Sequence, residues 1–221
     1  RLSADYHFKE SGVRRIAAIY DVKNLAYTES WLREFTVDFQ QLGGDVLPFA
    51  FESSPDANFG AIVRHALNKR PDAILLITSA VDAARFSQKV RDRDPQVLLF
   101  ASQWAATDRL IELGGNAVEG IVLHSYFDRD SKAEGMAHLR SVYVERFQRE
   151  PGFAGVAAYD ATRAVLEGLA RRQGGEPLRD ALLMRGPFAG AENGVSFDRF
   201  GDSRRIPHIA VVRDGQFVTV R

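Results

Sequence analysis

The sequence predicts an α/β fold, a Rossmann-like parallel sheet flanked by helices. Three observations support this fold: short apolar runs recur along residues 14–126, amphipathic segments separate them, and Gly or Pro marks most junctions. Strands that alternate with helices form right-handed βαβ units, and such units build a parallel sheet that is covered on both faces.

The apolar runs predict five strands, at residues 14–20, 45–51, 72–78, 97–101 and 118–126. Between the first two strands, apolar residues recur every three or four positions, at Leu32, Phe35, Phe39 and Leu42. Gly43 and Gly44 end this predicted helix, and Pro71 ends the next one, which covers Phe59 to Leu67. Two further helices are predicted, over 82–93 and 107–113.

The pattern changes after residue 126. Two helices, predicted over 131–149 and 155–172, follow each other with no strand between them, and a Gly- and Asn-rich segment comes at 187–198. Residues 206–220 predict a hairpin that turns at Asp214 and Gly215. The two helices carry apolar stripes, and such stripes need a partner surface.

The composition is that of an electrically neutral globular chain. Of the 221 residues, 45% are hydrophobic, and Lys+Arg and Asp+Glu number 29 each. Without a basic face to displace counterions from phosphate, we predict no nucleic-acid partner. No apolar run reaches the ~18 residues of a membrane span, so no direct membrane insertion is expected. The first residues contain no apolar signal-peptide core, which leaves the compartment open because a processed chain would look the same.

The sequence offers little support for catalysis or for metal binding. It contains no cysteine, and its five histidines are scattered with no pair four residues apart, so no zinc site is expected. The patterns Gly-x-Ser-x-Gly, Gly-x-Gly-x-x-Gly and Gly-Lys-Ser/Thr are absent. We therefore predict a protein that is not an enzyme and that uses no cofactor or metal.

Ligands of parallel α/β sheets bind beyond the carboxyl ends of the strands. The segments that we expect at this edge are 21–28, 78–82 and 101–106. Tyr27 and Thr28 open a helix after the first strand, and Gln103 and Trp104 follow the fourth. A Tyr or Trp in such a place either belongs to the core or offers a ring surface to a ligand. Together these residues suggest a pocket wall that combines rings with hydrogen-bonding groups.

Several stretches resemble the type I periplasmic binding proteins, and in particular the Leu/Ile/Val-binding (branched-chain amino-acid) group that serves ABC importers. The first part of residues 14–28 resembles the strand, and Ala26-Tyr27-Thr28 the helix entry, that open the family's second lobe. The other stretches that resemble the family are 71–76, 118–121, 157–161, 194–202 and 214–218. Their order and spacing carry the resemblance.

The resemblance implies two lobes, of which one is incomplete. Residues 10–125 and 196–221 would form lobe two of the binding protein, and residues 126–195 would form a helical remnant of lobe one. The family's first lobe begins with a βα run that has no counterpart here, so we expect the chain to start at the hinge into lobe two. The partner surface for the two apolar stripes would then come from the missing part or from another chain.

The resemblance also implies a set of ligand-binding residues. The predicted set is Tyr27, Thr28, Ser79, Ala80, Gln103, Trp104 and Tyr159. Tyr27 would form an aromatic wall of the cleft in lobe two, Ser79 and Ala80 would meet the ligand after the central strand, and Tyr159 would face the cleft from a lobe-one helix.

Trp104 departs from the family's pattern. Amino-acid-binding members commonly place an acid near this position, where it holds the ligand's ammonium. A neutral ring cannot replace a carboxylate in a charge-assisted hydrogen bond, although it attracts a cation weakly over its face. The departure disfavours an α-amino acid and favours an apolar or aromatic carboxylate, an amide or another small polar metabolite.

These implications predict a periplasmic solute-binding protein. It would close two lobes over a small amino acid or a related carboxylate or amide, and the closed form would meet the membrane permease of an ABC importer. The alternative is a ligand-sensing input domain of a receptor or regulator with the same fold. A transmembrane helix or a DNA-binding headpiece outside these residues would indicate that alternative.

Overall fold

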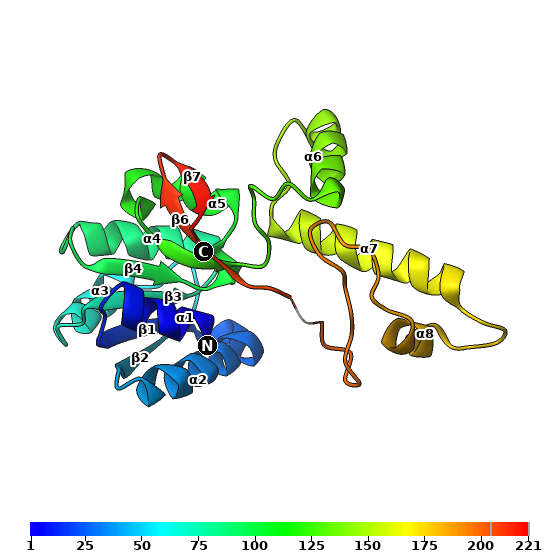
Figure 1. Cartoon of the computed structure of the whole chain (residues 1–221). Coiled ribbons are helices and arrows are strands. Elements are labelled where there is room, and N and C mark those ends of the chain that lie inside the picture. The colour runs from blue at the N-terminus through cyan, green and yellow to red at the C-terminus, as the bar shows by residue number, and fades with distance from the viewer. Residues whose placement is uncertain (204, 221) are drawn as a thin grey trace. The chain divides into compact units, whose positions relative to one another are not determined.

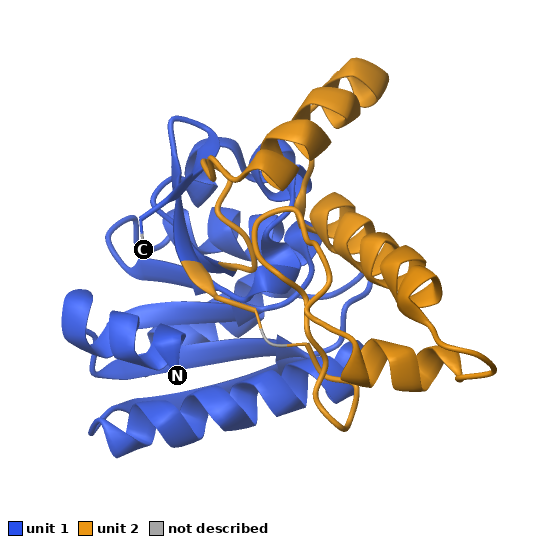
Figure 2. Cartoon of the chain, turned by 45° about the vertical axis from the view of Figure 1, so that its right-hand side comes forward, with its two compact units in different colours: residues 1–124, 209–221 blue, residues 125–208 orange. Residues whose placement is uncertain are grey.

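The computed structural model describes residues 1–203 and 205–220. The chain forms two compact units (Figure 2). Unit 1 contains residues 1–124 and returns from residue 209 onward, and unit 2 contains residues 125–208. Unit 1 thus includes residues 1–9, which the resemblance assigns to neither lobe. Unit 2 includes residues 196–208, which the resemblance assigns to lobe two. The assignment of 10–125 with 196–221, and of 126–195, to the two lobes of a binding protein stays a prediction.

A mostly parallel sheet of seven strands forms the centre of unit 1, in the order β2-β1-β3-β4-β5-β6-β7 (Figure 1). The strands are β1 (Arg15–Asp21), β2 (Asp45–Phe51), β3 (Ala73–Ile77), β4 (Leu98–Ala101), β5 (Val122–Ser125), β6 (His208–Arg213) and β7 (Gln216–Thr219). Neighbours among β1 to β5 pair in parallel, whereas β6 and β7 form an antiparallel hairpin. The predicted α/β fold class is confirmed.

Helices cover both faces of this sheet. The helical segments of unit 1 are α1 (Leu2–Asp5), η1 (Tyr6–Glu10), η2 (Val22–Asn24), α2 (Leu25–Gln41), α3 (Phe59–Leu67), α4 (Ala80–Arg91), η3 (Gln103–Ala105), α5 (Asp108–Gly114) and η4 (Gly115–Val118). All five residues of β3 are buried, and their side chains alternate between two cores. Leu75 and Ile77 pack with α1 and α2, whereas Ile74 and Leu76 pack with α3, α4 and α5. Because helices lie on both faces, β3 is a continuous apolar run.

The described residues of unit 2 form three helices and a long loop. The helices are α6 (Glu134–Phe147), α7 (Phe153–Arg171) and α8 (Leu178–Met184). In the loop, Phe188 and Val195 form an isolated antiparallel bridge and pack with Ala164 of α7. The apolar stripe of α7 is covered in part, since Leu166 is 59% exposed and Leu169 is 45% exposed.

The predicted strand 118–126 is wrong in its first half. η4 ends at Val118, and the strand begins only at Val122. Gly120 adopts a left-handed backbone (φ 77°), which a strand excludes, while its N–H donates to the carbonyl of Val212 at 2.9 Å. The Glu119 carboxylate accepts the backbone N–H of Asp214 at 2.7 Å. Residues 119–121 therefore support the hairpin, and of the three only Ile121 is buried.

The hairpin and the first residues differ in how well the sequence predicts them. The predicted turn at Asp214 and Gly215 is confirmed, with both residues at positive φ as a two-residue hairpin turn requires. The helical segments α1 and η1 are not predicted, because nine residues are too few to show a helical period. Ala4 and His7 are nevertheless buried against the sheet.

Candidate functional site

The strand order of unit 1 points to one edge of the sheet. β1 lies beside β3, but the helices that follow these strands, α2 and α4, belong to the cores on opposite faces. In open α/β sheets, ligands bind beyond the carboxyl ends of the strands at such a reversal. We call the residues at this point, 21–28 after β1 and 78–82 after β3, the switch edge.

Two predicted residues, Tyr27 and Trp104, meet in the structure. Tyr27 lies in the first turn of α2 and Trp104 lies in η3, directly after β4. Their ring centroids are 5.7 Å apart and their planes stand at 76°, the edge-to-face arrangement that aromatic pairs favour. Both residues are half-buried. The rings therefore form one aromatic surface, although 77 positions separate them in the sequence.

Gln103 is held by a residue that the sequence did not single out. Nε1 of Trp31 donates a hydrogen bond to Oε1 of Gln103 at 3.1 Å, and the Trp31 ring stacks on Phe35 at a centroid distance of 5.4 Å. This contact ties η3 to α2. The adjacent Ser102 is completely buried, and its hydroxyl has no hydrogen-bond partner within the described residues.

Thr28, Ser79 and Ala80 stabilise the local backbone. The buried Thr28 hydroxyl donates to the carbonyl of Asp21 at 2.8 Å. Ser79 is the N-cap of α4, where its hydroxyl oxygen accepts the N–H of Asp82 at 3.2 Å. Ala80 begins α4 and is buried. Contacts of these three residues with a ligand stay predictions.

Two buried carboxylates at the switch edge escaped the sequence analysis. Oδ1 of Asp21 accepts the backbone N–H groups of Lys23 at 3.0 Å and of Ser53 at 3.1 Å. Oδ2 of Asp82 accepts the hydroxyl groups of Ser53 at 2.7 Å and of Ser79 at 3.1 Å. Ser53 therefore joins the two carboxylates. A signal for Asp82 was present in the sequence, because Ser79-x-x-Asp82 has the spacing of a helix capping box.

Two histidines of unit 1 are packing residues. Burial, with a smaller contribution from the N-terminal amino group, lowers the pKa of His124 to about 4. Burial also lowers the pKa of His7 well below its usual value, with a smaller contribution from His124. The His7 ring stacks on Phe100 at 3.5 Å. The described residues contain no group of three His, Asp or Glu side chains that could hold a metal ion.

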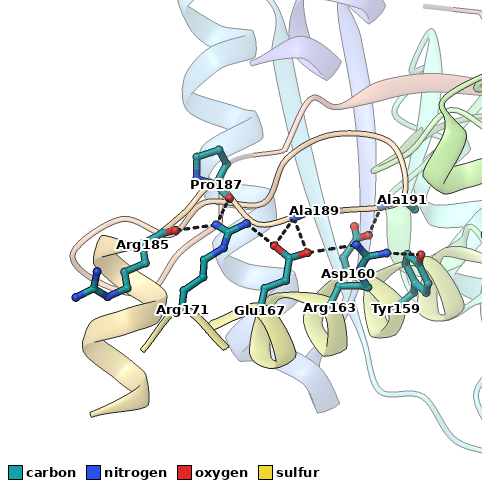
Figure 3. Close-up of polar contacts among 9 residues, drawn as sticks. All are labelled: Tyr159, Asp160, Arg163, Glu167, Arg171, Arg185, Pro187, Ala189 and Ala191. Carbon is teal, nitrogen blue, oxygen red and sulfur yellow. Dashed lines mark hydrogen bonds and ion pairs between the residues drawn. The ribbon is translucent and has the colours of Figure 1, made fainter. Parts of the chain in front are cut away.

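Tyr159 lies in unit 2, at the start of a ladder of charged side chains on α7 (Figure 3). Nη1 of Arg163 donates to the Tyr159 hydroxyl oxygen at 3.0 Å, and this bond, followed by the one to Glu167, raises the pKa of Arg163. The Glu167 carboxylate also binds Arg171 at 2.6 Å and accepts the N–H of Ala189 at 3.2 Å. The ladder fixes the loop against α7 and holds the Tyr159 hydroxyl in place.

Asp160 of unit 2 is a further residue that sequence reasoning missed. Its buried carboxylate accepts the N–H of Ala191 at 2.7 Å through Oδ1 and binds Nη1 of Arg205 at 2.7 Å through Oδ2. Close by, Oε1 of Glu192 lies 3.3 Å from Nε2 of His208. Asp160, Glu192 and Arg205 line a cavity of about 140 Å³ within unit 2. These contacts hold the segment through which the chain leaves unit 2.

Comparisons with known proteins agree with the fold. A family model described as periplasmic binding protein matches residues 3–213. No curated protein sequence matches the chain. Within the described residues, no helix has both the length and the apolar character that crossing a membrane requires.

Three solved structures illustrate the likeness. A leucine-binding protein from Thermotoga maritima is 25% identical, with a TM-score of 0.92, and the match covers 100% of this chain and 63% of that one. A branched-chain amino acid transporter substrate-binding protein (LivJ) from Streptococcus pneumoniae, in complex with isoleucine, is 15% identical, with a TM-score of 0.85 and coverage of 99% and 63%. A solute-binding protein of an ABC transporter from Rhodopseudomonas palustris, in complex with 3,4-dihydroxybenzoic acid, is 19% identical, with a TM-score of 0.82 and coverage of 99% and 62%. The chain therefore spans less than two thirds of the length of these relatives, which are binding proteins rather than enzymes.

Proposed function

The chain belongs to the periplasmic binding protein family, and from this premise we propose that it is the solute-binding component of an ABC importer. Its place of action would be the periplasm, and its partner the importer's membrane permease. The proposed ligand is a small amino acid or a related carboxylate or amide. The complexes of its relatives with isoleucine and with 3,4-dihydroxybenzoic acid support this range of ligands.

The observation that carries the proposal is the edge-to-face pair of Tyr27 and Trp104. It stands beyond the carboxyl ends of the strands, where ligands of open α/β sheets bind. Small-molecule sites combine such apolar walls with a few polar groups. Ser79 supplies a hydroxyl group after β3, the strand that lies between β1 and β4 in the sheet. We propose that the two rings contact the apolar body of the solute.

The remaining predicted residues complete this proposal. Tyr159 would contribute from unit 2 when ligand contacts favour a closed arrangement, as hinge-closing binding proteins require. Its hydroxyl is held by Arg163 at 3.0 Å, so its position is defined before any ligand arrives.

The first test is a panel of solutes, followed by thermal unfolding. The protein, expressed with any segments that flank residues 1–221, is heated with leucine, isoleucine, valine, phenylalanine, benzoate, 3,4-dihydroxybenzoate and benzamide. A solute at about 100 times its dissociation constant stabilises the folded state by roughly 2.7 kcal/mol, which appears as a clear rise of the unfolding midpoint. We expect at least one member to raise the midpoint.

Variants locate the binding surface. Trp104→Ala is expected to abolish the shift, because it removes one of the two rings. Phe200→Ala is the matched control, since this ring is 74% exposed in unit 2 and lies outside the proposed site. Silence across the panel, or unchanged binding by Trp104→Ala, would contradict the proposal.

The import role needs its own measurement. Cells that lack the protein should lose uptake of the radiolabelled solute, and expression of the unaltered protein should restore it. Normal uptake in the deletion strain, together with a lost transcriptional or motility response to the solute, would support a ligand sensor instead.

A further inference from the structure

We propose that Asp82 is a positioning residue that makes the switch edge select ligand groups able to donate hydrogen bonds. The proposal deepens the proposed function and rests on it, because it concerns the polarity of the group that meets Ser79. It is based on the hydrogen bonds that the Asp82 carboxylate accepts from Ser53 and Ser79.

Asp82 holds two hydroxyl groups with one oxygen atom. Its carboxylate is buried in the first turn of α4, where Oδ2 lies 2.7 Å from Oγ of Ser53 and 3.1 Å from Oγ of Ser79. Both serines are half-buried, whereas Asp82 is only 4% exposed. The serines therefore lie between the carboxylate and the solvent-accessible side of the edge.

The chemistry of the groups fixes the direction of both hydrogen bonds. A carboxylate oxygen only accepts, whereas a serine hydroxyl has one hydrogen and two acceptor lone pairs. Two hydroxyl oxygens at hydrogen-bond distance from one carboxylate oxygen are attracted to it only if each points its hydrogen at Asp82. Ser79 also accepts the N–H of Asp82, which leaves it one free lone pair. The free side of each serine thus presents an acceptor and no hydrogen.

Neither buried carboxylate of the switch edge is neutralised by an ion pair within the described residues. Within the described residues, no Lys or Arg forms an ion pair with Asp82 or with Asp21, the second buried carboxylate that Ser53 joins to it. The nearest lysine in sequence, Lys23, pairs with the exposed Glu52 at 3.5 Å. The switch edge therefore combines serine acceptors with buried negative charge.

A ligand group at Ser79 must then supply the hydrogen. An ammonium, an amide N–H or a hydroxyl group can do so, whereas a carboxylate oxygen would face a lone pair with no hydrogen between the two atoms. After β4, Trp104 stands near the position where amino-acid-binding members of the family commonly have an acid that holds the ligand's ammonium. The Asp82 network provides acceptors for a donor group at the end of β3 instead.

Paired solutes test the inference on the complete protein. Each pair shares its apolar body and differs in one polar group: leucine against 4-methylpentanoate for the ammonium, and benzamide against benzoate for the amide. Dissociation constants are measured by calorimetry. In at least one pair, the donor-bearing member is expected to bind at least about tenfold more tightly, the value of one hydrogen bond.

Asp82→Ala should reduce this ratio towards one, because it frees both hydroxyl hydrogens to meet an acceptor on the ligand. A purely structural role would weaken both members of a pair equally and leave the ratio unchanged. Asp92→Ala is the matched control, since Asp92 is an exposed acid at the other end of α4 that pairs with Lys89. If Asp82→Ala does not fold, Ser79→Ala provides the same test, because it removes the acceptor itself.

The outcomes separate the inference from the proposed function. Binding of any solute without preference for the donor, or a ratio that survives in Asp82→Ala or Ser79→Ala, would overturn the inference and leave the proposed function standing. Binding of neither member of any pair, together with silence across the wider panel, would contradict both.

Discussion

His124 should make unit 1 sensitive to mild acid. Burial lowers its pKa to about 4 in the folded protein, against about 6.5 in an unfolded chain. Between these values the unfolded chain binds a proton that the folded one does not. Stability is therefore complete above pH 6.5 and falls as the pH drops from 6.5 towards 4.

The size of the effect follows from the two pKa values. Linkage gives a loss of about 2 kcal/mol in the free energy of unfolding between pH 7 and pH 5 from His124 alone. His7 acts in the same direction, because burial also lowers its pKa. For a domain whose total stability is roughly 5–15 kcal/mol, this loss is easily measured.

Denaturant unfolding at pH 7, 6 and 5 is the assay, with tryptophan fluorescence as the signal. His124→Leu should flatten the pH dependence by about 2 kcal/mol over this range, because leucine carries no proton into the unfolded state. His65→Gln is the control, since His65 lies on the exposed side of α3 and should leave the dependence in place. Equal slopes for His124→Leu and the unaltered protein would refute the reasoning.

Two further substitutions probe the cores of the two units. Phe86→Ala removes a completely buried ring that packs edge-to-face with Phe51 and Phe59, so the free energy of unfolding should fall by about 3–5 kcal/mol in a denaturant titration. A loss below about 1 kcal/mol would contradict this packing. Asp160→Ala leaves Arg205 and the N–H of Ala191 without their acceptor, which should cost about 2–3 kcal/mol. Amide hydrogen exchange should then accelerate at Ala191, and an unchanged rate would show that the bond does not hold the loop.

Most of the fold could be predicted because the apolar residues that recur at helix or strand spacing are largely the residues that the structure buries. The β3 run is apolar on every residue, and only a strand covered on both faces needs such a sequence. The hairpin turn was predictable because Asp214 and Gly215 are residue types that tolerate positive φ. The prediction of a strand at 118–121 was wrong because it was based on the apolar residues at the two ends of this stretch. Val118 and Ile121 are completely buried, whereas Glu119 and Gly120 between them are exposed, and two apolar residues alone do not distinguish such a turn from a strand.

The site was predictable only where side chains stand next to a strand end. Tyr27 and Trp104 were identified in this way. Their contact could not be predicted, because it depends on the order of the strands in the sheet, and the spacing of apolar residues along the chain does not determine that order. Asp82 was missed for another reason. A carboxylate three residues after a serine has an ordinary explanation as a helix cap, and its burial and its second hydroxyl partner, Ser53, become visible only in three dimensions.

The double role of Asp82 sets a limit on how this site can vary. The residue completes the cap of α4, since its N–H binds Ser79 and its carboxylate receives two hydroxyl groups. Replacing Ser79, the N-cap residue, would change the polarity of the switch edge and also remove a contribution of about 1 kcal/mol to the start of this helix, whereas Asp82→Ala keeps the backbone N–H that Ser79 accepts. The aromatic pair carries no such constraint, because Tyr27 and Trp104 are half-buried and neither side chain caps the helical segment, α2 or η3, in which it lies. Changes in the ligand's apolar body should thus be accommodated at Tyr27 and Trp104, whereas the requirement for a donor should persist as long as both Ser79 and Asp82 are kept.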